Sequence, residues 1–296
     1  AEKVDWHEIP GRDELWKEDT IRALGSIEAF NQEFGNVFLE SGESAVDESL
    51  FEELKPFCKE PEYVFDEGAY KIWAEPSPDK LYVAGVDIAE GVGDNASVVQ
   101  VLDITDLTNI EQVAVYHSNT ISPYNFTTKL HEILQNWGSP LVAIERNNCG
   151  AQVVDHLYNT HGYSNLIHFA PNANKNTNYQ RLGVVAHTNT KYKGVMNMRY
   201  WINELRVLRI NDINTLNELR DFVRNPNGTW SAKKETDCFD DRVMSLVWAL
   251  ICLEKELTEK YFDLIELDDN GKPLKIQSLN YGERPYMNPL SIYNNE

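Results

Sequence analysis

The sequence predicts an α/β domain built on a mixed sheet. Three observations predict it: three β-rich runs follow one another with short turns between them, strands and helices then alternate, and a long apolar helix closes the region. Three antiparallel strands followed by helix, strand, helix, strand and a final helix is the order of a ribonuclease-H-like fold. In that fold, helices pack on both faces of a mixed five-stranded sheet.

The elements follow in order along the chain. The β-rich runs cover residues 81–87, 96–103 and 112–117, and the Gly, Asp, Asn and Thr residues between them favour an antiparallel meander. The elements expected after them are helix 124–136, strand 141–145, helix 151–160, strand 166–169, helix 191–205, extended segment 207–210, helix 215–224, strand 229–232 and helix 240–258. An Asn-rich loop is expected at 171–180. The last helix is apolar on nearly every side, which predicts that it is buried.

The chain divides into three predicted parts. Residues 1–80 form a helical lead-in and an acidic connector, residues 81–258 form the α/β domain, and residues 259–296 form an irregular polar extension. Within the first part we expect a helix over 13–35 and one short helix near 47–54. The sequence begins with Ala rather than Met, so we expect it to be part of a longer protein.

Composition excludes several classes of protein. The longest apolar stretch, Val243–Leu253, is shorter than the roughly 20 residues that a membrane-spanning helix needs. The four cysteines are far apart and form no CxxC pair, which argues against a zinc ribbon or a disulfide scaffold and favours a reduced intracellular compartment. No GxxxxGK(S/T) motif occurs, so the chain has no P-loop for ATP.

The net charge of −20 at neutral pH is unevenly distributed. Acidic residues outnumber basic ones over residues 1–160, whereas basic residues outnumber acidic ones over 161–260. A local basic face on an acidic body is typical of a protein that handles a polyanion at one surface. A solvated helix surface explains the same composition equally well.

Acidic residues stand at the ends of two predicted core strands and at the start of the closing helix. Asp87 ends the first strand, Glu145 ends the strand at 141–145, and Asp240 and Asp241 open the helix. The two strands are parallel neighbours in the predicted sheet, so we expect the carboxylates to meet at one end of it. Taken singly, a strand-end Asp is usually a turn former and an Asp pair before a helix is usually a cap. Their joint placement favours a metal site.

Converging carboxylates repel one another unless a cation lies between them. All-oxygen ligands select a hard divalent ion such as Mg²⁺ or Mn²⁺. Two such ions about 3.5–4 Å apart can clamp a phosphodiester, activate water and stabilise the leaving 3′ oxygen. Asp87 would bridge the ions, Glu145 would hold one and help orient water, and Asp241 would hold the other. The sequence separates Asp240 and Asp241 poorly, but Asp240 is the better helix cap and Asp241 the better ligand.

Four motifs resemble those of one protein family. The motifs are Gly85-Val-Asp87-Ile-Ala-Glu90-Gly91-Val-Gly-Asp94, Val115-Tyr-His117-Ser-Asn-Thr120-Ile-Ser122, Ala143-Ile-Glu145-Arg-Asn147 and Asp240-Asp241-Arg-Val-Met-Ser-Leu. Together they resemble the nuclease domain of the large terminase subunit of T-even-type tailed bacteriophages over about residues 81–258. Segments within residues 6–38 resemble the part that follows the packaging ATPase in that family.

The resemblance implies a headful-packaging endonuclease that cuts concatemeric viral double-stranded DNA in the cytoplasm of the infected bacterial host. The residues that match the family's motifs are Asp87, Glu145 and Asp241 for the metal-binding triad and Glu90, Gly91 and Asp94 for a further motif beside the first ligand. Phe239 stands where the family often has His, so the resemblance supports no proton-transfer role at that position.

The resemblance also implies partners. They are the ATPase domain of the same full-length chain, the portal of the procapsid and the small terminase subunit, with no membrane involved. DNA would lie over the metal site, and the expected phosphate contacts are Lys191, Lys193, Arg199, Lys233 and Lys234.

Two alternatives stay open: a non-cutting module that grips DNA or docks on the portal, and a junction resolvase or transposase-type nuclease on the same fold. The helical lead-in over 1–39 disfavours the second.

Overall fold

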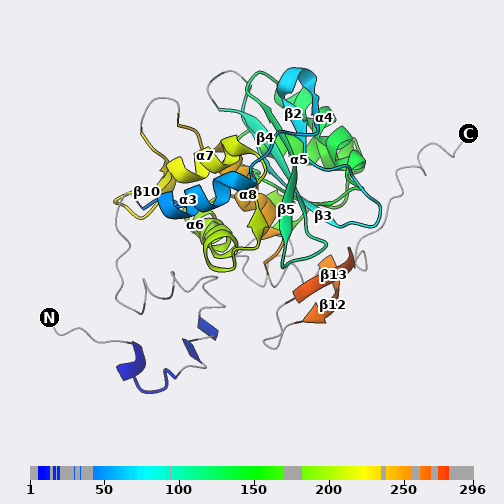
Figure 1. Cartoon of the computed structure of the whole chain (residues 1–296). Coiled ribbons are helices and arrows are strands. Elements are labelled where there is room, and N and C mark those ends of the chain that lie inside the picture. The colour runs from blue at the N-terminus through cyan, green and yellow to red at the C-terminus, as the bar shows by residue number, and fades with distance from the viewer. Residues whose placement is uncertain are drawn as a thin grey trace, which may run out of the picture.

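The structure is a computed structural model of the chain (Figure 1). It describes residues 6–13, 16–17, 19–20, 30, 34, 43–91, 93, 95–169, 182–234, 238–254, 261–267 and 273–279. Its described helices of seven or more residues are α3 (Glu48–Leu54), α4 (Pro123–Asn136), α5 (Gly150–Asn159), α6 (Thr188–Arg199), α7 (Ile213–Asp221) and α8 (Asp241–Ile251). The strands are β1 (Tyr63–Phe65), β2 (Tyr70–Ile72), β3 (Tyr82–Asp87), β4 (Ser97–Asp103), β5 (Ile110–Ser118), β6 (Leu141–Ile144), β7 (His168–Phe169), β8 (Gly183–Val184), β9 (Leu208–Arg209), β10 (Phe222–Arg224), β11 (Trp230–Ala232), β12 (Phe262–Leu267) and β13 (Pro273–Leu279).

A seven-stranded mixed sheet forms the centre of the domain. Its path runs β1-β2-β5-β4-β3-β6, and β9 pairs with β5. Strands β3, β4 and β5 form the predicted antiparallel meander, and β6 runs parallel to β3. The predicted mixed α/β fold of the ribonuclease-H-like type is therefore confirmed.

The sheet differs from the predicted five strands at both edges. Strands β1 and β2 come from the acidic connector, where we predicted no strand, and β2 pairs with β5 because Tyr70 and Ile72 bury their side chains against the sheet. At the other edge, Leu166 meets β6 only through an isolated bridge to Val142, and β7 pairs with β8 instead. Segments of two or three residues are too short to show the alternation of buried and exposed side chains that indicates a strand, so the sequence did not predict how they pair.

Helices cover both faces of the sheet. Figure 1 shows α3, α6, α7 and α8 on one side and α4 and α5 on the other. Each side has its own apolar core. The predicted short helix near 47–54 is confirmed as α3, and its Leu50 and Phe51 are buried in the core of the first side. The connector is thus partly built into the domain.

Local sequence explains where several helices begin. Ser122 accepts a hydrogen bond from the backbone N–H of Asn125 and caps α4, and Pro123 occupies the first turn. Asp212 caps α7 in the same way. The predicted helix 191–205 begins at Thr188 and continues beyond Arg199 as a π-helical turn.

The structure corrects two predictions, one for a helix and one for the C-terminal extension. The helix predicted over 215–224 stops at Asp221, because Phe222 enters a hairpin with β11 and stacks on Trp230 with ring centroids 5.9 Å apart. The extension predicted to be irregular contains the antiparallel pair of β12 and β13. The closing helix α8 ends at Ile251, and residues 255–260 lie outside the described part. Most of the predicted helix 13–35 and the whole loop 171–180 also lie outside it.

Helix α8 lies directly on β3, and this contact positions the candidate site. A Cβ at Gly85 would lie 2.0 Å from the carbonyl oxygen of Ser245 and 2.1 Å from the backbone nitrogen of Ala249. Only glycine therefore permits this approach of helix to strand. Across the described residues, no helix is long and apolar enough to cross a membrane.

Candidate active site

Asp87 and Glu145 lie at the same end of two neighbouring parallel strands. Val86 pairs with Ile144, and the backbone N–H of Glu145 donates to the carbonyl oxygen of Val86 at 3.1 Å. Asp87 ends β3 and Glu145 follows β6, so the two acids are side by side, as the parallel pairing predicts. Glu145 also forms a side-chain hydrogen bond with Asp87.

The start of α8 brings two more carboxylates to this end of the sheet. Asp241 is only 7% exposed, and one of its oxygens accepts a hydrogen bond from the backbone N–H of Ala96 at 2.9 Å. Asp240 occupies the N-cap position, as predicted, but its side chain makes no capping hydrogen bond. Its carboxylate instead lies 3.6 Å from the ammonium nitrogen of Lys191.

Burial and mutual repulsion perturb these acids. Burial raises the pKa of Asp87 well above its ordinary value, and the charges of Glu145 and Asp241 raise it further. Burial also raises the pKa of Glu145, although Lys191 and a hydrogen bond from the Trp248 indole at 3.1 Å oppose the rise. Such upward pKa shifts are typical of carboxylates that lie close together with too few positive charges nearby to offset their repulsion.

Asp241 shows the same tendency. Burial raises its pKa to about 6, against the hydrogen bond from Ala96, and the charges of Glu218 and Asp240 add to the rise. A carboxylate with this pKa is partly protonated near neutral pH, and a bound cation would favour its charged form.

The chemistry of this donor set fits a hard divalent ion, because every candidate ligand is a carboxylate oxygen. Within the described ranges, no three His, Cys, Asp or Glu side chains are already arranged so that they could hold a metal ion. Asp87, Glu145, Asp240 and Asp241 thus share one end of the sheet without forming a closed ligand set. We refer to these four residues as the carboxylate cluster.

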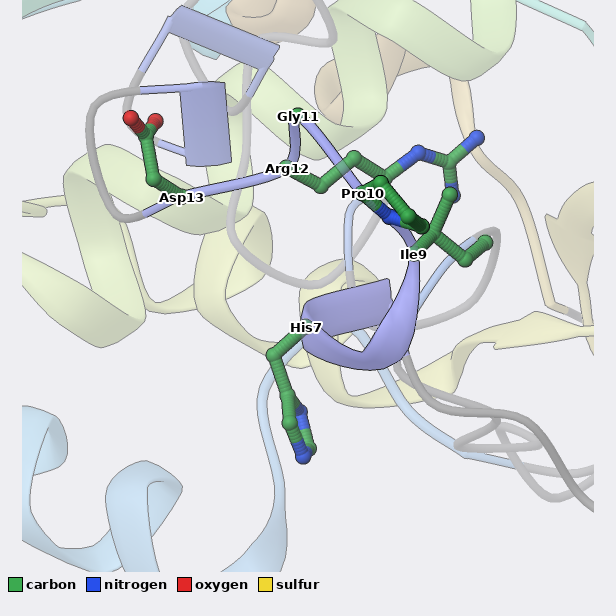
Figure 2. Close-up of a pocket in the computed structure, with 6 residues that line it drawn as sticks. All are labelled: His7, Ile9, Pro10, Gly11, Arg12 and Asp13. Carbon is green, nitrogen blue, oxygen red and sulfur yellow. The ribbon is translucent and has the colours of Figure 1, made fainter.

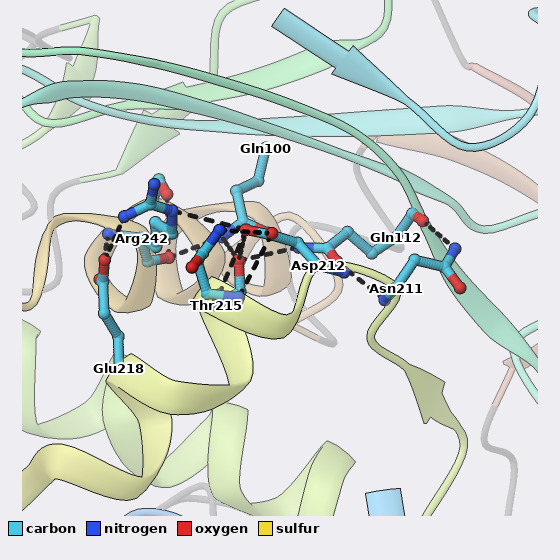
Figure 3. A network of polar contacts seen from close by, with 9 residues as sticks. Gln100, Gln112, Asn211, Asp212, Thr215, Glu218 and Arg242 are labelled. Atoms are coloured by element: carbon cyan, nitrogen blue, oxygen red, sulfur yellow. Dashed lines mark hydrogen bonds and ion pairs between the residues drawn. The ribbon is translucent and has the colours of Figure 1, made fainter. Parts of the chain in front are cut away.

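A second group of polar residues anchors the start of α8 (Figure 3). Arg242, which follows Asp241, donates to Glu218 at 2.5 Å and lies 3.4 Å from a carboxylate oxygen of Asp212. Gln100 of β4 donates to the carbonyl oxygen of Arg242 at 2.7 Å and accepts from Gln112 of β5 at 2.7 Å. The helix start is therefore attached to two strands and to α7. We call Gln100, Gln112, Asp212, Glu218 and Arg242 the anchoring network.

Sequence reasoning missed the anchoring network. Gln100 and Gln112 are completely buried inside otherwise apolar strands. A buried amide requires partners, so these two glutamines were a usable signal that polar groups pack there. Which helix would supply the partners could not be predicted, because Thr215 and Arg242 are far away in sequence.

The predicted DNA contacts fall into two kinds of environment. Lys193 and Lys234 are exposed, and the part-exposed Lys233 pairs with Asp221 at 2.8 Å. Arg199 is 5% exposed, donates to Glu43 at 2.5 Å and stacks on Trp230 at 4.9 Å. The prediction that Arg199 contacts DNA is therefore wrong, because its guanidinium is used inside the fold.

The backbone of the motif beside Asp87 bends at Gly91. Gly91 has φ of 75°, and a Cβ there would lie 2.2 Å from the carbonyl oxygen of Ile121. Glu90 is exposed next to it, and Asp94 lies outside the described residues. A different feature, a hollow of about 340 Å³, is lined by His7, Ile9, Pro10, Gly11, Arg12 and Asp13 (Figure 2). No element that carries the carboxylate cluster contributes to it.

Comparison with protein families decides what kind of domain this is. Residues 84–253, more than half of the chain, match the family model of the terminase RNaseH-like domain. The chain belongs to this family. The match begins within β3 and extends just past the end of α8, so it contains all four residues of the carboxylate cluster.

Solved structures agree with this fold for the terminase domain. The large terminase nuclease from thermophilic phage G20c with bound magnesium is 21% identical, with a TM-score of 0.50, and the match covers 68% of this chain and 96% of that chain. The same nuclease with bound cobalt is 22% identical, with a TM-score of 0.50 and the same coverage. The narrower prediction of a T-even-type phage stays a prediction.

Proposed function

We propose that this terminase domain is a divalent-metal-dependent endonuclease that cuts concatemeric viral double-stranded DNA during genome packaging. The observation that carries the proposal is the convergence of Asp87, Glu145 and Asp241 from two strands and a helix, all with a raised pKa. Carboxylates are collected in this way where an ion offsets their repulsion. Membership of the terminase RNaseH-like family supports the choice of DNA as substrate.

Each acid has a proposed role that follows from its place. Asp87, which interacts electrostatically with both other acids, would be shared by two Mg²⁺ or Mn²⁺ ions, Glu145 would hold one ion, and Asp241 would hold the other. Such ions, when bound, activate water and stabilise the leaving 3′ oxygen of a phosphodiester. Trp248 and the N–H of Ala96 fix the orientations of Glu145 and Asp241 by hydrogen bonds. The magnesium and cobalt bound in the G20c nuclease support a divalent ion here.

Other residues of the domain supply the remaining proposed parts. Lys193, Lys233 and Lys234 would contact DNA phosphates, which position the duplex without reading its sequence. The bend at Gly91 would shape the loop that follows Asp87, and Glu90 and Asp94 of the same sequence motif would support the site. The proposed partners are an ATPase domain of the same longer chain, the small terminase subunit and the portal of the procapsid, in the cytoplasm of the infected host.

A plasmid-cutting assay tests the proposal. The chain should nick or linearise supercoiled plasmid in Mg²⁺ or Mn²⁺ and lose this activity in EDTA. Asp87→Asn, Glu145→Gln and Asp241→Asn should each abolish cutting while thermal unfolding shows a folded protein. Asp79→Asn, at an exposed position outside the cluster, is the matched control and should cut normally. Plasmid binding without any metal-dependent cutting would instead favour the non-cutting DNA-gripping module.

A further inference from the structure

Two lysines on α6 have different surroundings although they carry the same charge. The ammonium nitrogen of Lys191 lies 3.6 Å from Asp240, and the Lys191 side chain is 35% exposed. Lys193, two residues further along, is exposed. Lys191 therefore contacts the carboxylate cluster, whereas Lys193 lies on the surface.

The backbone fixes Lys191 beside the cluster. The side-chain amide of Asn147 exchanges two hydrogen bonds with the backbone of Ala186: its Nδ2 donates to the carbonyl oxygen at 3.0 Å, and the Ala186 N–H donates to its Oδ1 at 3.1 Å. A β-bridge between Glu145 and Val184 adds to this attachment. The segment that enters α6 is thus tied to the loop that carries Glu145.

Helix α6 also approaches α8 closely. A Cβ at Gly194 would lie 2.6 Å from Cγ1 of Val247. Lys191 is consequently placed between the strand end that carries Glu145 and the helix start that carries Asp240. Its position is set by packing and backbone hydrogen bonds, and not by the ion pair alone.

The charge of Lys191 acts on more than Asp240. It lowers the pKa of both Asp87 and Glu145, in opposition to their burial. An ammonium group placed in this way offsets part of the repulsion among the acids. A divalent ion that binds the same carboxylates would offset the same repulsion. The ion and the Lys191 ammonium are both positive, so they would repel each other at this site.

We propose that Lys191 is the resident counter-ion of the carboxylate cluster and competes with divalent ions for it. The proposal rests on the proposed metal-dependent function. Lys191 is a positioning residue: it holds Asp240 while the acids carry no ion, and it sets how much free metal is needed to load the site. Removing its charge should therefore strengthen metal binding, which simple damage to the fold would not do.

Calorimetric titration of Mn²⁺ into the whole chain without DNA tests this competition. Lys191→Gln should bind Mn²⁺ about 3- to 20-fold more tightly, since a part-exposed unit charge roughly 5–10 Å from a divalent ion repels it by about this much at the dielectric constant of water. Lys191→Arg keeps the charge and should bind like the wild type. Lys193→Gln is the matched control: it removes the same charge from an exposed position and should change the affinity less than about twofold.

Two further measurements separate the possible failures. The Asp87→Asn variant measures how much Mn²⁺ binds to acidic residues outside the cluster. Thermal unfolding in EDTA shows whether each variant is folded. Equal or weaker Mn²⁺ binding by folded Lys191→Gln, in a wild type that binds Mn²⁺ and cuts plasmid, overturns this proposal alone. A wild type without any Mn²⁺ binding that Asp87→Asn removes would overturn both this proposal and the proposed function.

Discussion

The carboxylate cluster and the anchoring network meet at the start of α8 and use charge in opposite ways. In the cluster, four acids share the ammonium of Lys191 and the more distant charge of Arg242. In the network, Arg242 lies between Glu218 and Asp212, and Asp212 also accepts hydrogen bonds from Thr215. Thus Asp241 belongs to a group with too little positive charge, whereas the next residue, Arg242, belongs to a group whose charges are paired. A site that binds a cation needs acidic groups whose charge the protein itself does not neutralise. The neighbouring network of ion pairs and hydrogen bonds fixes the position of these groups.

Removing the central residue of the network should have the largest effect on stability. Arg242→Met leaves Glu218 and Asp212 buried without their guanidinium, and we expect the free energy of unfolding to fall by about 3–5 kcal/mol. Urea denaturation measures the change. Arg206→Met is the control, because the Arg206–Glu53 pair is exposed and should contribute at most about 1 kcal/mol. Similar losses in both variants would contradict the anchoring role.

Separating the helix from the sheet should disturb both groups at once. Gly85→Ala introduces a Cβ 2.0 Å from the Ser245 carbonyl oxygen, so α8 must shift, and we expect a loss of about 1–3 kcal/mol together with a loss of plasmid cutting. Gly93→Ala, where a Cβ meets nothing within 4 Å, should leave the free energy of unfolding within about 0.5 kcal/mol of the wild type. Unimpaired cutting by Gly85→Ala would mean that the contact does not position Asp241.

Asp241 of the cluster and His117, beside the network, should respond to acid in opposite directions. Asp241 has a pKa of about 6 in the folded chain, above its ordinary value of 3.8, so it takes up a proton more readily when folded. Its contribution to the free energy of unfolding should therefore rise as pH falls from above 6 to about 4. His117, near Arg242, has a pKa lowered from 6.5 to about 4, mainly by burial, and its contribution should be lost as pH falls through the same range.

Unfolding measured from pH 7 to pH 4 separates these contributions. Relative to the wild type, Asp241→Asn should lack the rise and His117→Gln should lack the loss, each by about 1–2 kcal/mol after allowance for solvent screening. Equal pH dependence in all three proteins would show that neither residue titrates as described. Saturating Mn²⁺ should remove the rise due to Asp241, because a bound ion keeps that carboxylate charged.

The smallest expected effect on stability comes from the centre of the cluster. Asp87→Asn removes a buried charge that its neighbours repel, so the free energy of unfolding without metal should stay equal or rise by about 1 kcal/mol. Cutting should nevertheless fall by at least about 100-fold. Denaturation in EDTA and the plasmid assay measure the two quantities. A marked loss of stability would place Asp87 among the anchoring residues instead.

Periodicity and the placement of acids predicted much of the cluster. The runs at 81–87 and 141–145 are apolar until their last residue, and parallel neighbours end at the same edge, so Asp87 and Glu145 had to meet. The edge strands β1 and β2 could not be predicted in this way, because three-residue segments carry almost no periodicity. Strand β2 is stabilised by pairing with β5, and β1 by pairing with β2. The hairpin of β10 and β11 likewise depends on stacking between Phe222 and Trp230.

The sequence by itself determined the order of strands and helices and the identity of the acids at their ends, because hydrophobic patterning acts over a few neighbouring residues. Only the tertiary structure decided the partners of the charges. Lys191, Lys193 and Arg199 lie on one helix with the same charge, yet one faces Asp240, one is exposed and one is buried against Glu43 and Trp230. The electrostatic environment of a side chain depends on its distance from charged residues that folding brings near it. Because those residues are far away in sequence, local sequence cannot predict these distances.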